Sequence, residues 1–226
     1  MMLSISKLLK KTGHQIYFNI FPVLSASVFW SLFLVPAIFV LPRHFAVLFL
    51  LVTFVPATTA VYAAMHQVTE THRVKVKDFF RHFFHFFSRS FLIGLLFSLA
   101  IVIPVSQWWY YLSVNPHFMM LVFALFQTYF CLTFLCTQVY TIPYLVIEDG
   151  KAIQSMNLSI KKFMSHTWYT MGLFTQILSI TVLLSLTIIG FFLLYIGMLS
   201  IFVLNATKNL SLEENETEEK QEEVEA

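Results

Sequence analysis

The sequence predicts an all-α, polytopic membrane helix bundle with six transmembrane helices, both termini in the cytoplasm and two amphipathic cytoplasmic helices. Three observations predict this class. The 226-residue chain is 58% hydrophobic and only 12% charged, which is about half the charged fraction of a typical soluble domain. Several of its apolar runs reach the roughly 20 residues that a crossing requires. Its Lys and Arg residues, apart from Arg43, fall at the two ends of the chain and on alternate connections between these runs, as the positive-inside rule demands.

The chain divides into a transmembrane domain, residues 1–210, and an acidic C-terminal tail, residues 211–226. The tail holds every acidic residue of the chain except Glu70, Asp78, Glu148 and Asp149. A segment of this composition has too little apolar surface to offset the entropy lost on ordering. We therefore expect a disordered, solvated cytoplasmic tail.

Six apolar segments of suitable length follow one another in the first domain. The expected spans are residues 17–41, 45–66, 91–112, 118–147, 168–187 and 190–207. The third ends in a cluster of Trp and Tyr, which prefer the membrane–water boundary. The fourth is longer than one crossing requires, so we expect it to tilt or to extend beyond the bilayer.

The last apolar run, residues 167–207, contains no charged residue. It can hold two crossings joined by a short turn near residues 188–190, or one very long helix that would leave five spans. The distribution of Lys and Arg favours six spans. All of these residues except Arg43 then lie in the expected cytoplasmic segments, which are residues 1–16, 67–90, 148–166 and 208–226.

A basic amphipathic helix is expected just before the third span. When residues 78–91 are placed on a helix, the phenylalanines fall on one side and the polar and charged side chains on the other. Such a helix normally lies in the interface, with rings among the acyl chains and cations among anionic headgroups. The residues expected at this membrane interface are Phe79, Phe80, Phe83, Phe84, Phe87, Arg81, His82, His85 and Arg89.

Two other interpretations of this helix are weaker. His82 and His85 share a face and suggest a metal site, but only Asp78 accompanies them at a suitable spacing. Nucleic-acid binding would need exposed rings on the same face as the cations, whereas here they lie on opposite faces. We therefore expect no metal, no cofactor and no nucleic-acid partner, and the lipid bilayer is the expected surrounding.

A second amphipathic helix is expected between the fourth and fifth spans. Its apolar stripe consists of Ile153, Met156, Ile160, Phe163 and Met164. We expect this cytoplasmic connector to be the loop that docks a protein partner. The residues expected to contribute are Glu148, Asp149, Lys151, Lys161 and Lys162.

The predicted spans contain no Asp, Glu, Lys or Arg, although transporters usually place ionisable groups inside the bilayer. The Asn, Gln, Ser and Thr residues found there more often bond between helices than line a substrate path. Cys131 and Cys136 are five residues apart in an apolar run and are expected to be small core residues. No familiar catalytic motif is present, so we expect neither catalytic residues nor an enzyme.

The stretch FVPATTAVYAAMHQVTETHRVKVKDFFRHFFHFFSRSFLIG resembles the signature region of the YesL-like family of bacterial integral membrane proteins, domain of unknown function 624. In that family a proline followed by small residues and Thr closes the second span, and a polar link and an aromatic helix follow. Pro56, Thr58, Thr59 and the segment Lys77–Phe80 occupy these places here. The later stretch VIEDGKAIQSMNLSIKKF is similar to the family's second inner loop, and the resemblance covers roughly residues 10–207.

The resemblance implies a six-helix protein in the plasma membrane of a bacterium. Since genes of the family often neighbour sugar ABC-transporter components, it implies an accessory or interaction role in carbohydrate transport, with those components as partners. The alternative is a small-solute permease or transporter subunit. An ABC permease should carry an E-A-A-x₃-G motif on an inner loop, and here a glycine follows Glu148 and Asp149 directly. The family supplies no established site residues to carry over.

Overall fold

The structure, a computed structural model, describes residues 5–71, 75–114 and 116–225, and for residues 43, 44 and 213–225 it describes the backbone alone. All of the secondary structure in these ranges is helical. The helices are α1 (Ile5–Phe18), α2 (Ile20–Phe39), α3 (Arg43–Thr71), α4 (Val76–Ser113), α5 (Phe118–Thr137), α6 (Thr141–Ile147), α7 (Ala152–Ser165), α8 (Thr167–Ser185) and α9 (Ile188–Glu225).

Six helical segments in the described ranges are long and apolar enough to cross a membrane. They are Ile20–Phe39, Phe45–Thr71, Val76–Ser113, Phe118–Ile147, Thr167–Ser185 and Ile188–Leu212. The predicted helical class is therefore confirmed, and the number of helices long and apolar enough to span a membrane equals the predicted number of spans. The last apolar run forms two helices, because α8 ends at Ser185 and α9 begins at Ile188, which excludes the five-span alternative.

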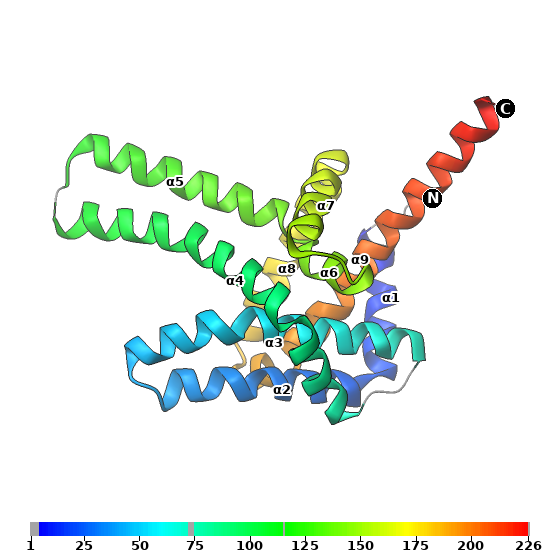
Figure 1. The fold of residues 1–226 in the computed structure, drawn as a ribbon, viewed down its shortest axis with the longest axis horizontal. Helices are drawn as coiled ribbons and strands as arrows, with labels where there is room; N and C mark the ends of the chain where they lie inside the picture. The colour runs from blue at the N-terminus through cyan, green and yellow to red at the C-terminus, as the bar shows by residue number, and fades with distance from the viewer. Residues whose placement is uncertain (1–4, 72–74, 115, 226) are drawn as a thin grey trace.

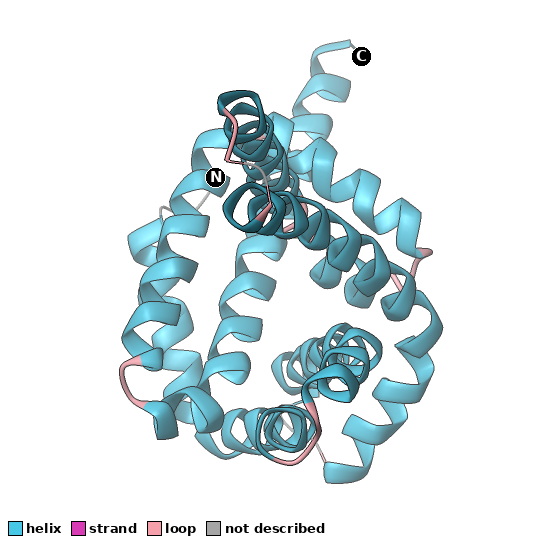
Figure 2. Cartoon of the chain, turned by 90° about the vertical axis from the view of Figure 1, so that its left-hand side faces the viewer, coloured by secondary structure: helices cyan, strands magenta, loops and turns pink. Residues whose placement is uncertain are grey.

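Two hairpins dominate the arrangement of the helices (Figure 1). One consists of α2 and α3, and the other consists of α5 with the second half of α4; both hairpin turns lie at the same end of the molecule. The helices α1 and α7 lie toward the other end. Figure 2 views the molecule from the side of the hairpin turns and shows helices joined by short loops.

The core lies where α2, α3 and α9 pack together. Small residues of α3, among them Ala57, Ala60 and Ala64, are fully buried there and allow the helices to approach closely. Polar groups join the same helices: the Trp30 indole N–H donates to the Thr58 hydroxyl at 3.0 Å. By contrast, few residues of α5 and α8 are buried, as suits helices that face lipid.

The boundaries of the helices differ from the prediction at several places. The first span begins at Ile20, because Asn19 separates it from an additional helix, α1. The predicted interface helix and the third span form one continuous helix, α4, of 38 residues. The fourth predicted span, residues 118–147, is divided into α5 and α6. At the C-terminus the backbone of α9 runs on to Glu225, but the tail's side chains lie outside the described residues and its expected disorder stays a prediction.

The break between α5 and α6 is capped by a serine of α7. The Ser159 hydroxyl donates to the carbonyl oxygen of Thr137 at 2.6 Å and accepts from the backbone N–H of Tyr140 at 3.1 Å. Backbone groups at a helix terminus lack helical partners, and Ser159 supplies one to each side of this break. Since Ser159 itself is buried, water is not available as a substitute.

Replacing Ser159 with alanine should lower the free energy of unfolding by about 1–3 kcal/mol, because two buried backbone groups lose their partner. The measurement is the unfolding equilibrium of the purified chain in detergent micelles. Ser165→Ala, at an exposed position of the same helix, is the matched control and should stay within about 0.5 kcal/mol of the native chain. Equal stability of the two variants would contradict the capping role.

Candidate functional site

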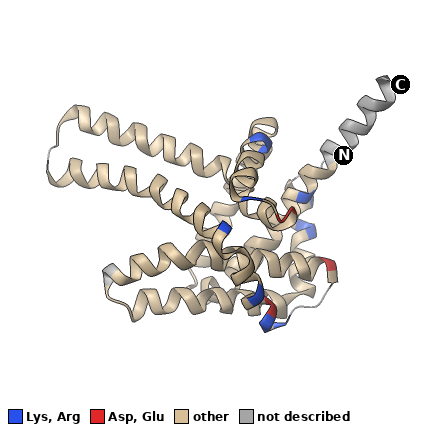
Figure 3. Ribbon diagram, viewed as in Figure 1, with Lys and Arg blue, Asp and Glu red and all other residues tan. Residues whose placement is uncertain are grey.

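The charged residues whose side chains the structure describes lie away from the two hairpin turns, toward the opposite end of the molecule (Figure 3). This end contains the lysines of α1, the first turns of α4, the loop between α6 and α7, and α7 itself. The helices of the two hairpins, which we call the apolar arms, contain no Asp, Glu, Lys or Arg over residues 45–69 and 90–147. Such a division is typical of helices that leave an apolar bilayer and enter water. We refer to the end of the molecule that contains these charged residues as the charged end.

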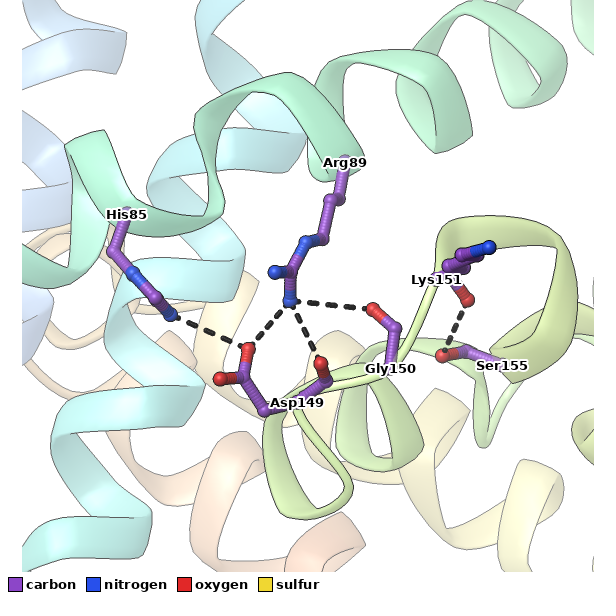
Figure 4. A network of polar contacts seen from close by, with 6 residues as sticks. All are labelled: His85, Arg89, Asp149, Gly150, Lys151 and Ser155. Carbon is purple, nitrogen blue, oxygen red and sulfur yellow. Dashed lines mark hydrogen bonds and ion pairs between the residues drawn. The ribbon is translucent and has the colours of Figure 1, made fainter.

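An arginine of α4 binds the loop between α6 and α7 (Figure 4). The Arg89 Nη1 donates to the Asp149 Oδ1 at 2.5 Å, to the Asp149 carbonyl oxygen at 2.8 Å and to the Gly150 carbonyl oxygen at 3.3 Å. The His85 Nε2 lies 3.3 Å from the same Asp149 Oδ1. One guanidinium group thus holds both the carboxylate and the backbone of the loop, and it fixes the start of α7 relative to α4.

Asp149 is suited to this loop by its backbone as well as by its charge. Its φ of 47° lies in the left-handed region, which Asp and Asn adopt more readily than most residues. Burial acts to raise its pKa, but the hydrogen bonds and positive charges of Arg89 and His85 outweigh this effect and lower the pKa below its ordinary value. The carboxylate is therefore ionised at neutral pH and available to Arg89.

The Asp149–Arg89 link should weaken on acidification. Because the pKa of Asp149 is lower in the folded chain, its contribution to stability is complete above the ordinary carboxyl pKa of about 3.9 and is lost as the pH falls through the folded value. The stability difference between the native chain and Asp149→Asn should be at most about 1 kcal/mol at neutral pH and should shrink below about pH 4. Unfolding midpoints between pH 3 and 7 test this; a pH-independent difference would contradict it.

Asp149→Ala provides a comparison for the backbone. Asn tolerates a positive φ and removes only the charge, whereas Ala also carries a left-handed backbone cost of roughly 1–2 kcal/mol. The alanine variant should therefore be the less stable of the two at every pH in that series.

The predicted interface phenylalanines of α4 divide between the protein core and the outer surface. Phe79 and Phe83 are buried. Phe79 stacks on Phe29 and Phe83 stacks on Phe33, both of α2, each with ring centroids 5.2 Å apart. These rings contact protein where the sequence led us to expect lipid, because α2 covers that side of α4. Phe80 and Phe84 remain exposed and Phe87 is half-buried, so they are the rings available to lipid.

The predicted polar face of α4 also makes contacts within the protein. The His82 Nε2 lies 2.9 Å from the Gln67 Oε1 of α3, and His85 and Arg89 contact Asp149 as described above. Arg81 is exposed. Among the described residues, no group of three or more His, Cys, Asp or Glu side chains is placed to hold a metal ion.

The predicted docking residues are not equally accessible. Asp149 is engaged by Arg89, and Lys162 is only 5% exposed. Glu148, Lys151 and Lys161 are exposed. Neither the Asp149–Arg89 contact nor the burial of Lys162 has a local signal in the sequence, since both depend on how distant helices pack.

Helix α7 buries small residues and exposes two of its apolar residues, while the rest of its predicted apolar stripe is half-buried. Ala152, Ser155 and Ser159 face the protein, whereas Ile153 is 62% and Met164 is 74% exposed. In water the reverse arrangement would be favoured. An outward apolar face on a lysine-bearing helix is typical of a membrane interface.

No family model matches the sequence, and no curated protein or solved structure is detectably similar to it. The fold and the charged end together nevertheless define a class. An all-helical chain with six helices long and apolar enough to cross a bilayer has the architecture of a multi-pass membrane protein.

Proposed function

We propose that the chain is a multi-pass protein of a bacterial plasma membrane, with its termini and α7 in the cytoplasm, and that it acts as an accessory or interaction protein of carbohydrate ABC-transport systems. The orientation is supported by the Lys and Arg residues, which avoid the connections at the hairpin-turn end except at Arg43. Resemblance to the YesL-like family supports the bacterial membrane and the link to ABC transport.

The observation that carries the interaction role is the contrast between the arms and the charged end. Residues 45–69 and 90–147 contain no Asp, Glu, Lys or Arg, the side chains that would most directly balance the charge of a transported ion. The charged end, in contrast, carries an ordered layer of α6, α7 and their loop, which Arg89 holds in place. A pre-ordered surface loses less entropy on binding a partner, and Glu148 lies exposed on it.

The test is co-purification from native membranes with the chain tagged at its C-terminus. We expect a subunit of a sugar ABC transporter to co-purify with the native chain, and its yield to fall severalfold in Glu148→Lys. Lys11→Glu is the control, because it reverses an exposed charge on α1 outside the proposed docking loop. Failure to recover any transporter subunit, or equal yields from both variants, would contradict the proposal. Sugar flux through vesicles that contain this chain alone would favour the permease alternative.

A further inference from the structure

A groove of about 650 Å³ lies between α4 and α7. Both apolar and polar side chains line it. Its lining includes the apolar Leu92, Ile153 and Leu158 and the polar Lys151, Asn157 and Lys161.

The polar side of the groove carries uncompensated positive charge. Lys151 and Lys161 are exposed, and within the described part of the chain neither forms a salt bridge. Asp149, close by in sequence, is occupied by Arg89 and His85, so it leaves the lysines free to attract an anion. The two lysines are ten residues apart, or about 15 Å along a helix axis, and one headgroup lying along α7 can contact both.

The groove also spans the boundary between the charged end and the apolar arms. Arg89 is the last charged residue of α4, and Leu92 belongs to the uncharged stretch that follows it. Trp168, just beyond α7, is 91% exposed, and exposed Trp side chains settle at the membrane–water boundary. The lysines are thus placed at headgroup level and the apolar lining at the level of the acyl chains.

We propose that this groove is a binding site for an anionic glycerophospholipid. The phosphate lies between Lys151 and Lys161, and an acyl chain follows Leu92, Ile153 and Leu158. Basic pockets beside transmembrane helices recognise anionic headgroups in this way. A zwitterionic lipid gains less, because its own cation opposes the two lysines.

The experiment is a lipid titration of the full chain, delipidated in detergent and followed by native mass spectrometry. We expect phosphatidylglycerol to bind roughly tenfold more tightly than phosphatidylcholine, and Lys151→Gln/Lys161→Gln to remove about that preference. The control, Lys10→Gln/Lys11→Gln, makes the same change in net charge at exposed positions of α1 and should retain the preference. Asn157→Trp keeps both lysines but fills the groove, so it should lower the affinity for phosphatidylglycerol as well.

Three results would overturn the proposal. The first is equal affinity for the two lipids, and the second is an equal loss in both double-lysine variants, which would indicate general surface charge. The third is a photo-crosslinker at position 157 that captures a protein and no phospholipid in native membranes, which would make the groove a protein-docking site. A thermal unfolding curve for each variant establishes that any lost binding occurs in a folded chain.

Discussion

A single methyl group added at Gly197 is expected to destabilise the packing of α2 against α9 by about 1–3 kcal/mol or more. A Cβ atom at this position would lie 2.5 Å from the carbonyl oxygen of Val23. Because the obstacle is backbone, the two helices must separate to admit the methyl group. Their separation would also break the hydrogen bond from the Gly197 backbone N–H to the Ser27 hydroxyl, which is 3.1 Å long and buried.

The control for Gly197→Ala is Gly13→Ala in α1. A Cβ at Gly13 would meet no atom within 4 Å, and Ala is favoured over Gly in a helix by about 0.5–1 kcal/mol. Free energies of unfolding in detergent should therefore change in opposite directions for the same chemical substitution. A neutral or stabilising Gly197→Ala would contradict the close approach of α2 and α9.

Loss of the Phe79 ring should cost roughly 3 kcal/mol. Phe79 is 1% exposed and packs against Phe29, and its removal leaves a cavity at the junction of α2 and α4. Phe84, in contrast, is 73% exposed, and its ring can exchange contacts with this helix for contacts with lipid or detergent. Phe84→Ala should therefore cost less than about 1 kcal/mol.

The comparison of these two variants measures which side of α4 contacts protein. The readout is again the unfolding equilibrium in detergent, with both variants at the same lipid content. A larger loss for Phe84→Ala than for Phe79→Ala would reverse the assignment and place Phe79 against lipid, as the helical wheel alone suggests.

The number of spans could be predicted because crossing a bilayer requires little more than length and apolar composition. The break between α5 and α6 could not, since neither Gly nor Pro occurs at residues 138–140 and the capping Ser159 comes from a later helix. The helical wheel of α4 places its aromatic rings on one side and its cations on the other. It does not show whether a ring contacts lipid or α2, because both surroundings favour apolar side chains. A sequence pattern therefore cannot separate Phe79 from Phe84.

The contacts within the candidate site likewise depend on how distant segments pack. Arg89 and Asp149 were both predicted to be site residues, one for the membrane interface and one for a docking loop. Their contact joins positions 60 residues apart in the chain, and no local spacing encodes it. The apolar stripe of α7 could be identified from the sequence. Which face of α7 contacts protein could not, because that face is set by Ser159, which hydrogen-bonds to backbone groups between α5 and α6.

The most direct test of this account is the accessibility of single cysteines in cells, with Cys131 and Cys136, both free and buried, replaced by alanine. Pro42→Cys and Ser113→Cys lie at exposed positions beside the two hairpin turns, and Ser165→Cys lies at the exposed end of α7. The six-span orientation predicts that a membrane-impermeant maleimide labels the first two in intact cells and labels position 165 only after permeabilisation. Labelling of position 165 in intact cells, or protection of position 113, would contradict it.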